Sequence, residues 1–526
     1  MRAASRTAKT TASYLGSNFC QTLMALAFYV LAVFCNNPHY MATVYRAYRT
    51  PQDRAKYRVF TVWVSALLFF MVGVLLWKPA LLPAVFTAYV LWSPWHYTGQ
   101  NFGIAMMMAR RNGVQPGRLD RNLIYLFFSA SFVLWALDFN TAGWDDPRIL
   151  SLGIRRSVAW PLEAALVAVS LLSGGWGVSR LVKQSSGRAM AALMTIMATQ
   201  LLWFLMPVMI RMSARLEVSP LFYSTGMLAF MHCAQYLWVT SYFARRESEN
   251  TPGRQWSFLK YYFILMTGGI ALFIPGPWII SLLFKRDLVE SLFIFVALVN
   301  LHHFILDGVI WKLRDNKIAR LLLGAIPAPH DAGLESDASN QGLGWLLGKT
   351  PPARILRWSF GATLLAVGAL DQLQYVLTTD KTTLPRLRAA QVVNANDTRV
   401  YFQRARILKD RGEIDAALSE LDRAIAMNPY NLAPQSLKGE LLSRLGQTGA
   451  AFEQFDRMAS LFKPMPMILI NAGVFAVRSG RAEKAIAIYE KAIATQSLDR
   501  LGQLLATRPA TGSPPNRTPA PSIPAK

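Results

Sequence analysis

Charged residues are scarce in this sequence, and cysteines are few. Only 16% of the 526 residues are Asp, Glu, Lys or Arg, whereas 53% are hydrophobic. That balance excludes an ordinary soluble protein and predicts an integral membrane protein with room for one modest water-soluble module. The three cysteines, Cys20, Cys35 and Cys233, all fall in apolar segments, which argues against a disulfide framework and a cysteine-ligated zinc site.

Acidic residues are also outnumbered, 30 against 55 Lys and Arg, which gives a net charge of +25. In a soluble chain this excess would suggest a nucleic-acid partner. Here the basic residues gather in short loops between apolar runs, so most of the charge is a signal of membrane topology. We expect no nucleic-acid partner.

Apolar runs of helical length predict the fold class. The class is all-α, a polytopic transmembrane helix bundle of nine or ten spans followed by an α-solenoid, because about 20 apolar residues make one span. The tenth run is weaker than the others, since Asp371 interrupts it. The expected spans are 14–36, 59–77, 80–108, 122–140, 158–179, 190–210, 220–243, 261–284, 288–311 and 356–377.

Alternate loops differ in basic charge, which predicts the orientation of the spans. Each loop of one set holds three to five Lys or Arg, and each loop of the other holds one to three. By the positive-inside rule the richer set is cytoplasmic, in the plasma membrane or the inner membrane of a bacterium, and the region after 356–377 is external or periplasmic. The richer loops are 46–58, 110–121, 180–188, 244–260 and 312–320.

A 34-residue repeat follows the spans. Gly412, Gly446 and Gly480 recur at this interval, and small residues recur at the expected contact point of each unit's first helix, at Ala405, Gly439 and Gly473. Thirty-four residues is the tetratricopeptide period, and about 397–498 resembles such repeats. The resemblance implies helix pairs that dock a protein or peptide partner and are separable from any chemistry in the membrane; a structural cap without a partner is the alternative.

The expected domains follow from these patterns. They are a membrane domain at 1–320 with a histidine-rich core, a linker at 321–355, the tenth span at 356–377, the repeats with a preceding half-repeat at 385–498, and a disordered Pro-rich tail at 507–526.

Five of the six histidines belong to the expected spans, and these five are His39, His96, His232, His302 and His303. One such histidine is usually a packing residue, but ionisable groups at membrane depth face the bundle interior. His302 and His303 are adjacent, so the five histidines occupy four sequence motifs. These motifs lie on the first, third, seventh and ninth spans, which run in the same direction. Each precedes a cytoplasmic basic cluster by a similar distance, so their depths differ by only about 10 Å. The pattern predicts one transition-metal site.

Imidazole ligands suit iron, copper, zinc or nickel and are poor for magnesium or calcium. The candidate metal ligands are therefore His39, His96, His232, His302 and His303. A polar residue three to five positions after each setting is expected to orient the ring nitrogen that does not bind metal. These residues are Thr43, Gln100, Gln235 and Asp307. Nearby aromatic residues such as Tyr97 and Tyr236 are expected to wall a channel for a hydrophobic substrate or to support the ligands, with an interfacial aromatic belt as the alternative.

The order of these motifs resembles the Brp/Blh family, integral membrane non-haem iron enzymes that cleave β-carotene to retinal. The matching motifs are Pro38-His39, His96-Tyr97 with Gly99, His232, and His302 to Asp307, over about 30–315. The resemblance implies an iron(II) centre, with copper or zinc as alternatives, and an oxygenase or oxidoreductase acting on a lipid-soluble substrate. It implies catalytic or supporting roles for Asp307, Tyr97 and Tyr236, and it favours His302 over His303 as ligand.

The sequence also departs from that family. Thr43 and Gln100 or Asn101 stand where the family has acidic residues after its first two histidines, and Tyr236 replaces a second histidine of the third motif. The family has no appended tetratricopeptide repeats. The substrate is therefore left open.

Two other function classes remain. Many multi-span proteins with C-terminal tetratricopeptide repeats are glycosyltransferases that use lipid-linked sugars and carry an acidic pair in the first external loop. The first loop here, 37–58, is basic and holds Asp53 alone, although Asp145-Asp146 lies in a loop expected to be external. The third class is a non-enzymatic membrane scaffold or transport protein whose histidines pack helices.

Overall fold

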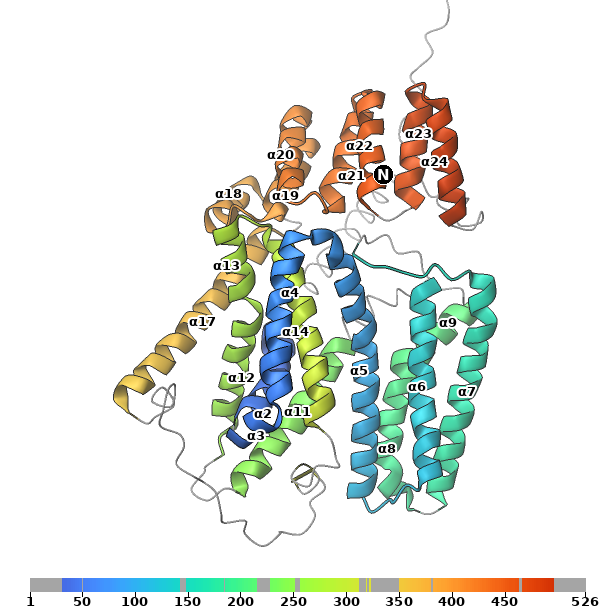
Figure 1. Ribbon diagram of the computed structural model, residues 1–526, viewed down its shortest axis with the longest axis vertical. Helices are drawn as coiled ribbons and strands as arrows, with labels where there is room; N and C mark the ends of the chain where they lie inside the picture. The colour runs from blue at the N-terminus through green and yellow to red at the C-terminus, as the bar shows by residue number, and fades with distance from the viewer. Residues whose placement is uncertain are drawn as a thin grey trace, which may run out of the picture.

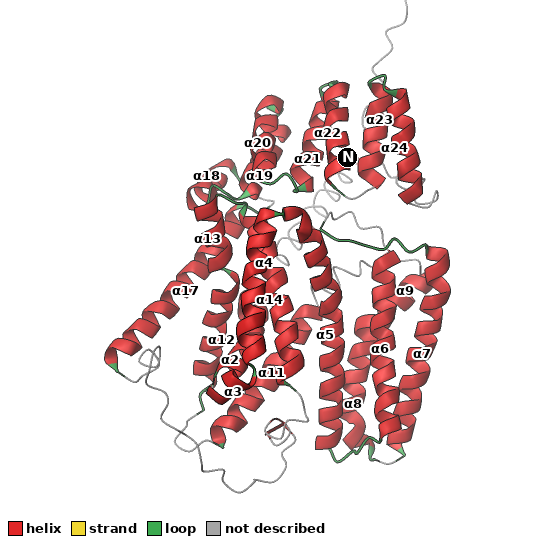
Figure 2. Cartoon of the chain, in the orientation of Figure 1, coloured by secondary structure: helices red, strands yellow, loops and turns green. Residues whose placement is uncertain are grey.

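The chain is helical wherever its structure is described. The computed structural model describes residues 31–49, 51–141, 148–183, 185–214, 228–250, 256–311, 318, 321–322, 350–379, 382–462 and 466–495. Within these ranges there is no strand, which confirms the predicted all-α class (Figure 2). The helices are α2 (Asn37–Tyr48), α3 (Pro51–Lys56), α4 (Ser65–Trp77), α5 (Leu82–Arg111), α6 (Arg118–Thr141), α7 (Arg156–Val182), α8 (Gly187–Gln200), α9 (Met206–Ala214), α11 (Leu228–Glu249), α12 (Phe258–Phe273), α13 (Pro275–Phe284), α14 (Leu288–Ile310), α17 (Pro351–Leu377), α18 (Leu384–Val393), α19 (Thr398–Asp410), α20 (Ile414–Met427), α21 (Leu432–Arg444), α22 (Thr448–Leu461), α23 (Pro466–Arg478) and α24 (Ala482–Thr495).

Seven helical segments in the described part of the chain are long and apolar enough to cross a membrane. They are Val59–Trp77, Arg118–Thr141, Arg156–Val182, Gly187–Ile210, Phe258–Phe284, Leu288–Ile310 and Pro351–Leu377, and each contains or overlaps a predicted span. Their outward faces carry large apolar side chains; Phe69, for example, is 75% exposed and Trp63 is 66% exposed. Such faces are costly in water and are compatible with a membrane protein.

Three predicted spans are not among the seven. The runs 80–108 and 220–243 correspond to α5 and α11, which are long helices but less apolar. Their lower hydropathy has a physical reason, because both carry polar residues that face the bundle interior, such as Asn101 and His232. Most of the first predicted span, 14–36, lies outside the described residues.

The helices that precede the repeats form two groups with α5 between them (Figure 1). One group contains α2, α4, α11, α12, α14 and α17, and the other contains α6 to α9. Helix α5 contacts α14 on one side and α6 and α8 on the other. The basic loops α5–α6 and α7–α8 lie at the end of the bundle farthest from the repeats (Figure 1).

The C-terminal helices form three pairs that follow the 34-residue period: α19 with α20, α21 with α22, and α23 with α24. Gly412, Gly446 and Gly480 have φ angles of 80°, 72° and 74° and form the turn inside each pair. These angles are in the left-handed region, which other residues rarely adopt. The recurring glycines are therefore the turns of a helical repeat.

The small residues predicted at the contact points are also where the helices touch. A Cβ atom at Gly439 would lie 2.6 Å from the Phe455 ring, and one at Gly473 would lie 2.7 Å from the Tyr489 ring. Ala405, at the same place in the first pair, is fully buried. Each pair therefore closes with a large side chain against a small one.

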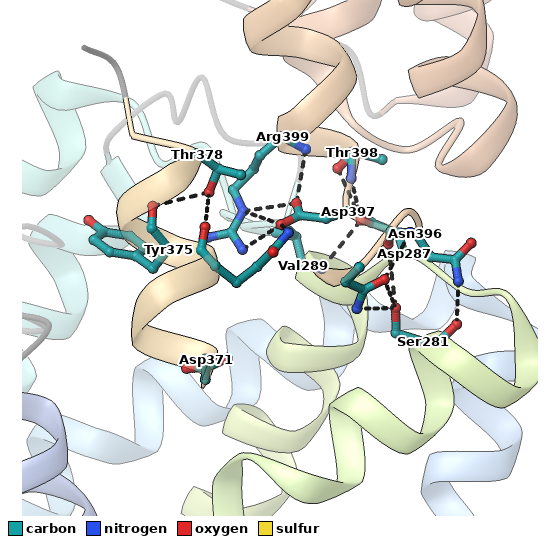
Figure 3. A network of polar contacts seen from close by, with 12 residues as sticks. Ser281, Asp287, Val289, Asp371, Tyr375, Thr378, Asn396, Asp397, Thr398 and Arg399 are labelled. Atoms are coloured by element: carbon teal, nitrogen blue, oxygen red, sulfur yellow. Dashed lines mark hydrogen bonds and ion pairs between the residues drawn. The ribbon is translucent and has the colours of Figure 1, made fainter. Parts of the chain in front are cut away.

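The first pair is hydrogen-bonded to the helix bundle through Asp287, the residue before α14 (Figure 3). Its carboxylate accepts bonds from the N–H groups of Val289 and Glu290, both at 3.3 Å, which caps the helix. It also accepts from the Thr398 N–H at 3.1 Å, the Thr398 hydroxyl at 3.0 Å and the Asn428 amide at 2.9 Å. Burial raises the pKa of Asp287, and the hydrogen bonds from Asn428 and Thr398 oppose that rise.

Further bonds make this junction extensive. The Leu288 N–H donates to the Asn396 carbonyl at 2.8 Å, and the Asn396 amide donates to the Ser281 carbonyl at 2.8 Å. The Gln374 amide of α17 donates to Asp397 at 2.9 Å. The first repeat is thus joined to the bundle's end by hydrogen bonds from several residues.

Asp371, which interrupts the tenth predicted span, is buried against α13. Its carboxylate accepts a hydrogen bond from the Trp278 indole at 2.9 Å. A charged residue inside an apolar helix is thereby given a polar partner instead of facing lipid.

Candidate metal centre

The helix that carries His39 is fixed in place by its own sequence and by α12. Pro38 has no N–H group, so the carbonyl of Phe34 lacks its helical partner, and the Tyr262 hydroxyl of α12 donates to it instead. A Cβ atom at Gly269 of α12 would lie 2.6 Å from the backbone of Asn37. Only glycine permits this close approach. Helix α12 therefore determines where His39 lies.

Four imidazole rings from four helices form a closed ring. They are His39 of α2, His232 of α11, His96 of α5 and His303 of α14. Neighbouring centroids around the ring are 5.3 Å apart for His39 and His232, 5.0 Å for His232 and His96, 4.9 Å for His96 and His303, and 4.6 Å for His303 and His39. His39 and His232 are 1% exposed and His303 is 2% exposed. The same-direction spans of the sequence prediction thus bring four histidines together.

The donor atoms are close enough to share a metal ion. Ring nitrogens of His39, His232 and His303 lie within 4.8 Å of one another, and so do donor atoms of His96, His303 and Asp307. His303 belongs to both groups and joins them. The shared His303 is surrounded by the imidazoles of His39, His232 and His96 and by the carboxylate of Asp307. This donor set suits iron, copper or zinc.

Several of these nitrogens have no hydrogen-bond partner within the described chain. They are Nε2 of His96, both ring nitrogens of His232, and Nε2 of His303. Buried polar atoms in proteins are nearly always paired, and an unpaired atom is costly. The unpaired nitrogens therefore fit a bound metal ion better than they fit helix packing.

Hydrogen bonds fix the tautomers of two of the rings. Nδ1 of His39 lies 2.6 Å from the Asn36 carbonyl, so this nitrogen carries the proton. Nε2 is then unprotonated, and its lone pair can bind a metal ion. Nδ1 of His303 lies 2.9 Å from the Thr43 hydroxyl, which itself donates to Asp307 at 2.8 Å. The Thr43 oxygen must then accept from His303, which leaves Nε2 of His303 bare as well.

Asp307 is held with one oxygen toward the histidines. Its Oδ1 accepts from the Tyr236 hydroxyl at 2.5 Å and from Thr43, and the Trp311 indole donates to the same tyrosine at 2.8 Å. Its Oδ2 lies 3.6 Å from Nε2 of His96 and 3.9 Å from Nε2 of His303. The carboxylate is thus oriented by three neighbours and points its second oxygen at the ring.

His302 lies outside the ring of histidines, although the family spacing favours it as the ligand. Its Nε2 lies 2.8 Å from the Ser65 hydroxyl of α4. Adjacent residues on a helix point about 100° apart, so only one of two neighbouring histidines can face a given centre. The structure places His303 in that position, and we correct the assignment accordingly.

The predicted supporting residues make other contacts than the sequence suggests. The Gln100 amide donates to the Gln235 side chain at 2.9 Å, which joins α5 to α11 without touching a histidine. Thr43 supports His303 of another helix and not His39 of its own. Tyr97 packs against the His232 ring at 4.3 Å between centroids.

Other residues of the centre have no sequence signal strong enough to find them. The Cys233 thiol lies 3.1 Å from Nδ1 of His39 and 3.2 Å from the Asn36 amide oxygen. Phe304 stacks on His96 at 4.7 Å between ring centroids. The Tyr40 hydroxyl donates to Asn300. In an aromatic-rich membrane sequence, such residues resemble ordinary packing.

An apolar cavity of about 620 Å³ reaches the centre and includes His96, Asp307 and Tyr236 in its wall. Residues from Trp92 to Met107 of α5 line it at helical spacing, which makes it about 20 Å long. Trp92 and Trp95, at one end of this stretch, are 40% and 37% exposed, so the cavity wall continues onto the outer surface of the bundle.

Some sequence predictions lie outside the described residues. These are the acidic pair Asp145-Asp146, most of the 321–355 linker and the 507–526 tail.

The tetratricopeptide repeat family matches residues 398–431, which are α19, α20 and the turn that follows them. This match agrees with the helix pairs described above and indicates a protein-docking domain. No curated protein matches the chain.

Proposed function

We propose that this protein is an integral membrane metalloenzyme, an oxygen-dependent oxidoreductase that acts on a lipid-soluble substrate. The observation that carries the proposal is the ring of four buried imidazoles, with unpaired nitrogens, beside an apolar cavity. Iron(II) is the metal we propose, and copper or zinc would fit the same donors.

His39, His96, His232 and His303 would hold the ion, with Asp307 beside them. Iron bound by these residues would supply the redox chemistry with dioxygen. Asn36 and Thr43 orient the imidazoles of His39 and His303. The aromatic wall of the cavity would exclude water, and the open oxygen of Asp307 would accept a proton from the substrate or return it.

The outward apolar faces and the basic loops support a membrane location. The loops α5–α6 and α7–α8 carry Arg and Lys at one end of the bundle, and the repeats lie at the other end (Figure 1). By the positive-inside rule, the repeats would then face the outside or the periplasm and would meet their protein partner there.

Elemental analysis of protein purified without added metal tests the proposal. We expect about one iron per chain, since one ring of donors is present. His303→Ala should abolish metal binding, whereas His302→Ala, one position away, should leave it unchanged. Both variants remove a histidine from α14, so the second controls for the loss of an imidazole from this helix.

Metal-free protein that retains activity would overturn the proposal. So would unchanged metal content in His96→Ala and His303→Ala, and the histidines would then be packing residues of a membrane scaffold.

A further inference from the structure

One amide interrupts the apolar wall of the cavity. Gln100 of α5 lines it and donates through Nε2 to Gln235 of α11 at 2.9 Å. Its other polar atom, Oε1, is buried and has no hydrogen-bond partner within the described chain. A buried acceptor is rarely left unpaired, so a group outside the described residues is expected to donate to it.

The position of this acceptor relative to the metal centre is defined by the helix. Gln100 follows His96 by four residues, which places it about one helical turn, roughly 6 Å, farther along the same wall. Both residues line the cavity, as does Asp307 from the facing helix α14.

The cavity is open beside the amide because glycines line it there. Gly99 and Gly103 of α5 and Gly308 of α14 all belong to the wall, and no atom lies within 4 Å of the place where a Cβ would stand on any of them. An elongated molecule can therefore pass Gln100 without displacing a side chain.

We propose that the cavity binds an elongated apolar molecule that carries a hydrogen-bond donor, in the simplest case a hydroxyl group, and that Gln100 Oε1 accepts this bond. The donor then fixes the molecule along the groove, and the carbon atoms about 6 Å from it lie against His96 and Asp307. Gln100 is thus a specificity-determining residue, because a site built to pair with a donor rejects the analogue that lacks one. This inference rests on the proposed function for the chemistry at His96, but the binding step does not need the metal.

Two matched photoreactive probes test it. One is 1-hexadecanol with a mid-chain diazirine, and the other is the corresponding hexadecane without the hydroxyl. The protein, reconstituted in lipid nanodiscs, is irradiated with each, and mass spectrometry measures labelling of the peptide that spans Trp92 to Met107. We expect about tenfold stronger labelling by the alcohol at equal concentration, the effect of one buried hydrogen bond.

Three variants separate the causes. Gln100→Leu should remove the preference for the alcohol and leave labelling by the alkane unchanged. Gln235→Leu leaves the acceptor Oε1 of Gln100 in place and should retain the preference for the alcohol. Gly103→Leu fills the cavity and should reduce labelling by both probes.

Metal content measured on the same samples keeps the two proposals apart. Equal labelling by both probes, with metal bound, would overturn this inference alone. A preference for the alcohol that depends on Gln100 in a protein without metal would overturn the proposed function alone. A preference that survives Gln100→Leu would also overturn the inference, because the donor would then bind elsewhere.

Discussion

Thr43 shows how much one hydroxyl contributes to the metal centre. Its oxygen contacts Nδ1 of His303, the Tyr236 hydroxyl and Oδ1 of Asp307. Thr43→Val has nearly the same shape but leaves these three groups without their common partner. We expect metal affinity, measured by competition with a chelator, to fall about 10–100-fold, as it does when supporting hydrogen bonds of metal ligands are removed.

Thr43→Ser keeps the hydroxyl and should bind metal nearly as tightly as the unchanged protein. Equal affinity of the valine and serine variants would show that the hydroxyl does not orient His303.

The sequence predicts the histidines of the centre better than it predicts their surroundings. Buried imidazoles in apolar helices are conspicuous, and the common direction of their spans places them at one depth. The choice between His302 and His303 depends on the rotation of α14 about its axis, which is set by packing against α2 and α4. The rotation of α14 about its axis cannot be predicted from a single sequence. For the same reason, Thr43 could be predicted as a supporting residue, but not that it supports the histidine of another helix.

At the scale of elements, the contact between α12 and α2 links the stability of the fold to the position of His39. Gly269→Ala places a Cβ 2.6 Å from the Asn37 backbone, which cannot move as a side chain can. We expect this substitution to push α2 away, to cost about 1–3 kcal/mol of stability and to weaken metal binding through His39. Thermal unfolding in detergent and metal content would measure the two effects.

Gly73→Ala is the matched control, because no atom lies within 4 Å of the added Cβ on α4. It should be neutral or stabilise the helix by about 0.5–1 kcal/mol. Equal stability of the two alanine variants would mean that α2 and α12 do not approach as closely as described.

Most helices were predictable from apolar runs alone, since length and hydropathy dominate at this scale. Helices α5 and α11 were predicted in the same way, but the polar residues that they carry in the interior leave them less apolar than the seven segments. The turns inside the helix pairs were predictable because residues other than glycine rarely adopt the left-handed angles of Gly412, Gly446 and Gly480.

At the scale of the whole molecule, the bundle and the first repeat are joined by hydrogen bonds to Asp287. A chain cut after Lys381 lacks Thr398 and Asn428, so the carboxylate of Asp287 loses three donors. We expect this truncation to lower the unfolding temperature and the metal content, because the hydrogen bonds that hold the head of α14 are lost, each worth about 0.5–1.5 kcal/mol.

A chain cut after Asn431 keeps the first repeat and should behave like the full protein. Asp287→Ala in the full chain should reproduce part of the loss, by removing the cap of α14. If both truncations were equally stable, the repeats would be a separable module after all. This junction was not predictable from sequence. It pairs Asp287, between two apolar helices, with residues of the polar repeat region that lie 111 and 141 positions later.

The Asp287 junction also sets an order of events during synthesis. Thr398 and Asn428 follow Asp287 by 111 and 141 residues, so at about 5–20 residues per second they leave the ribosome on the order of 10 s later. During that delay α14 and α17 are made, while the carboxylate at the head of α14 still awaits its partners. The head of the helix that carries His303 and Asp307 is therefore completed only once the first repeat has been translated and folded against it.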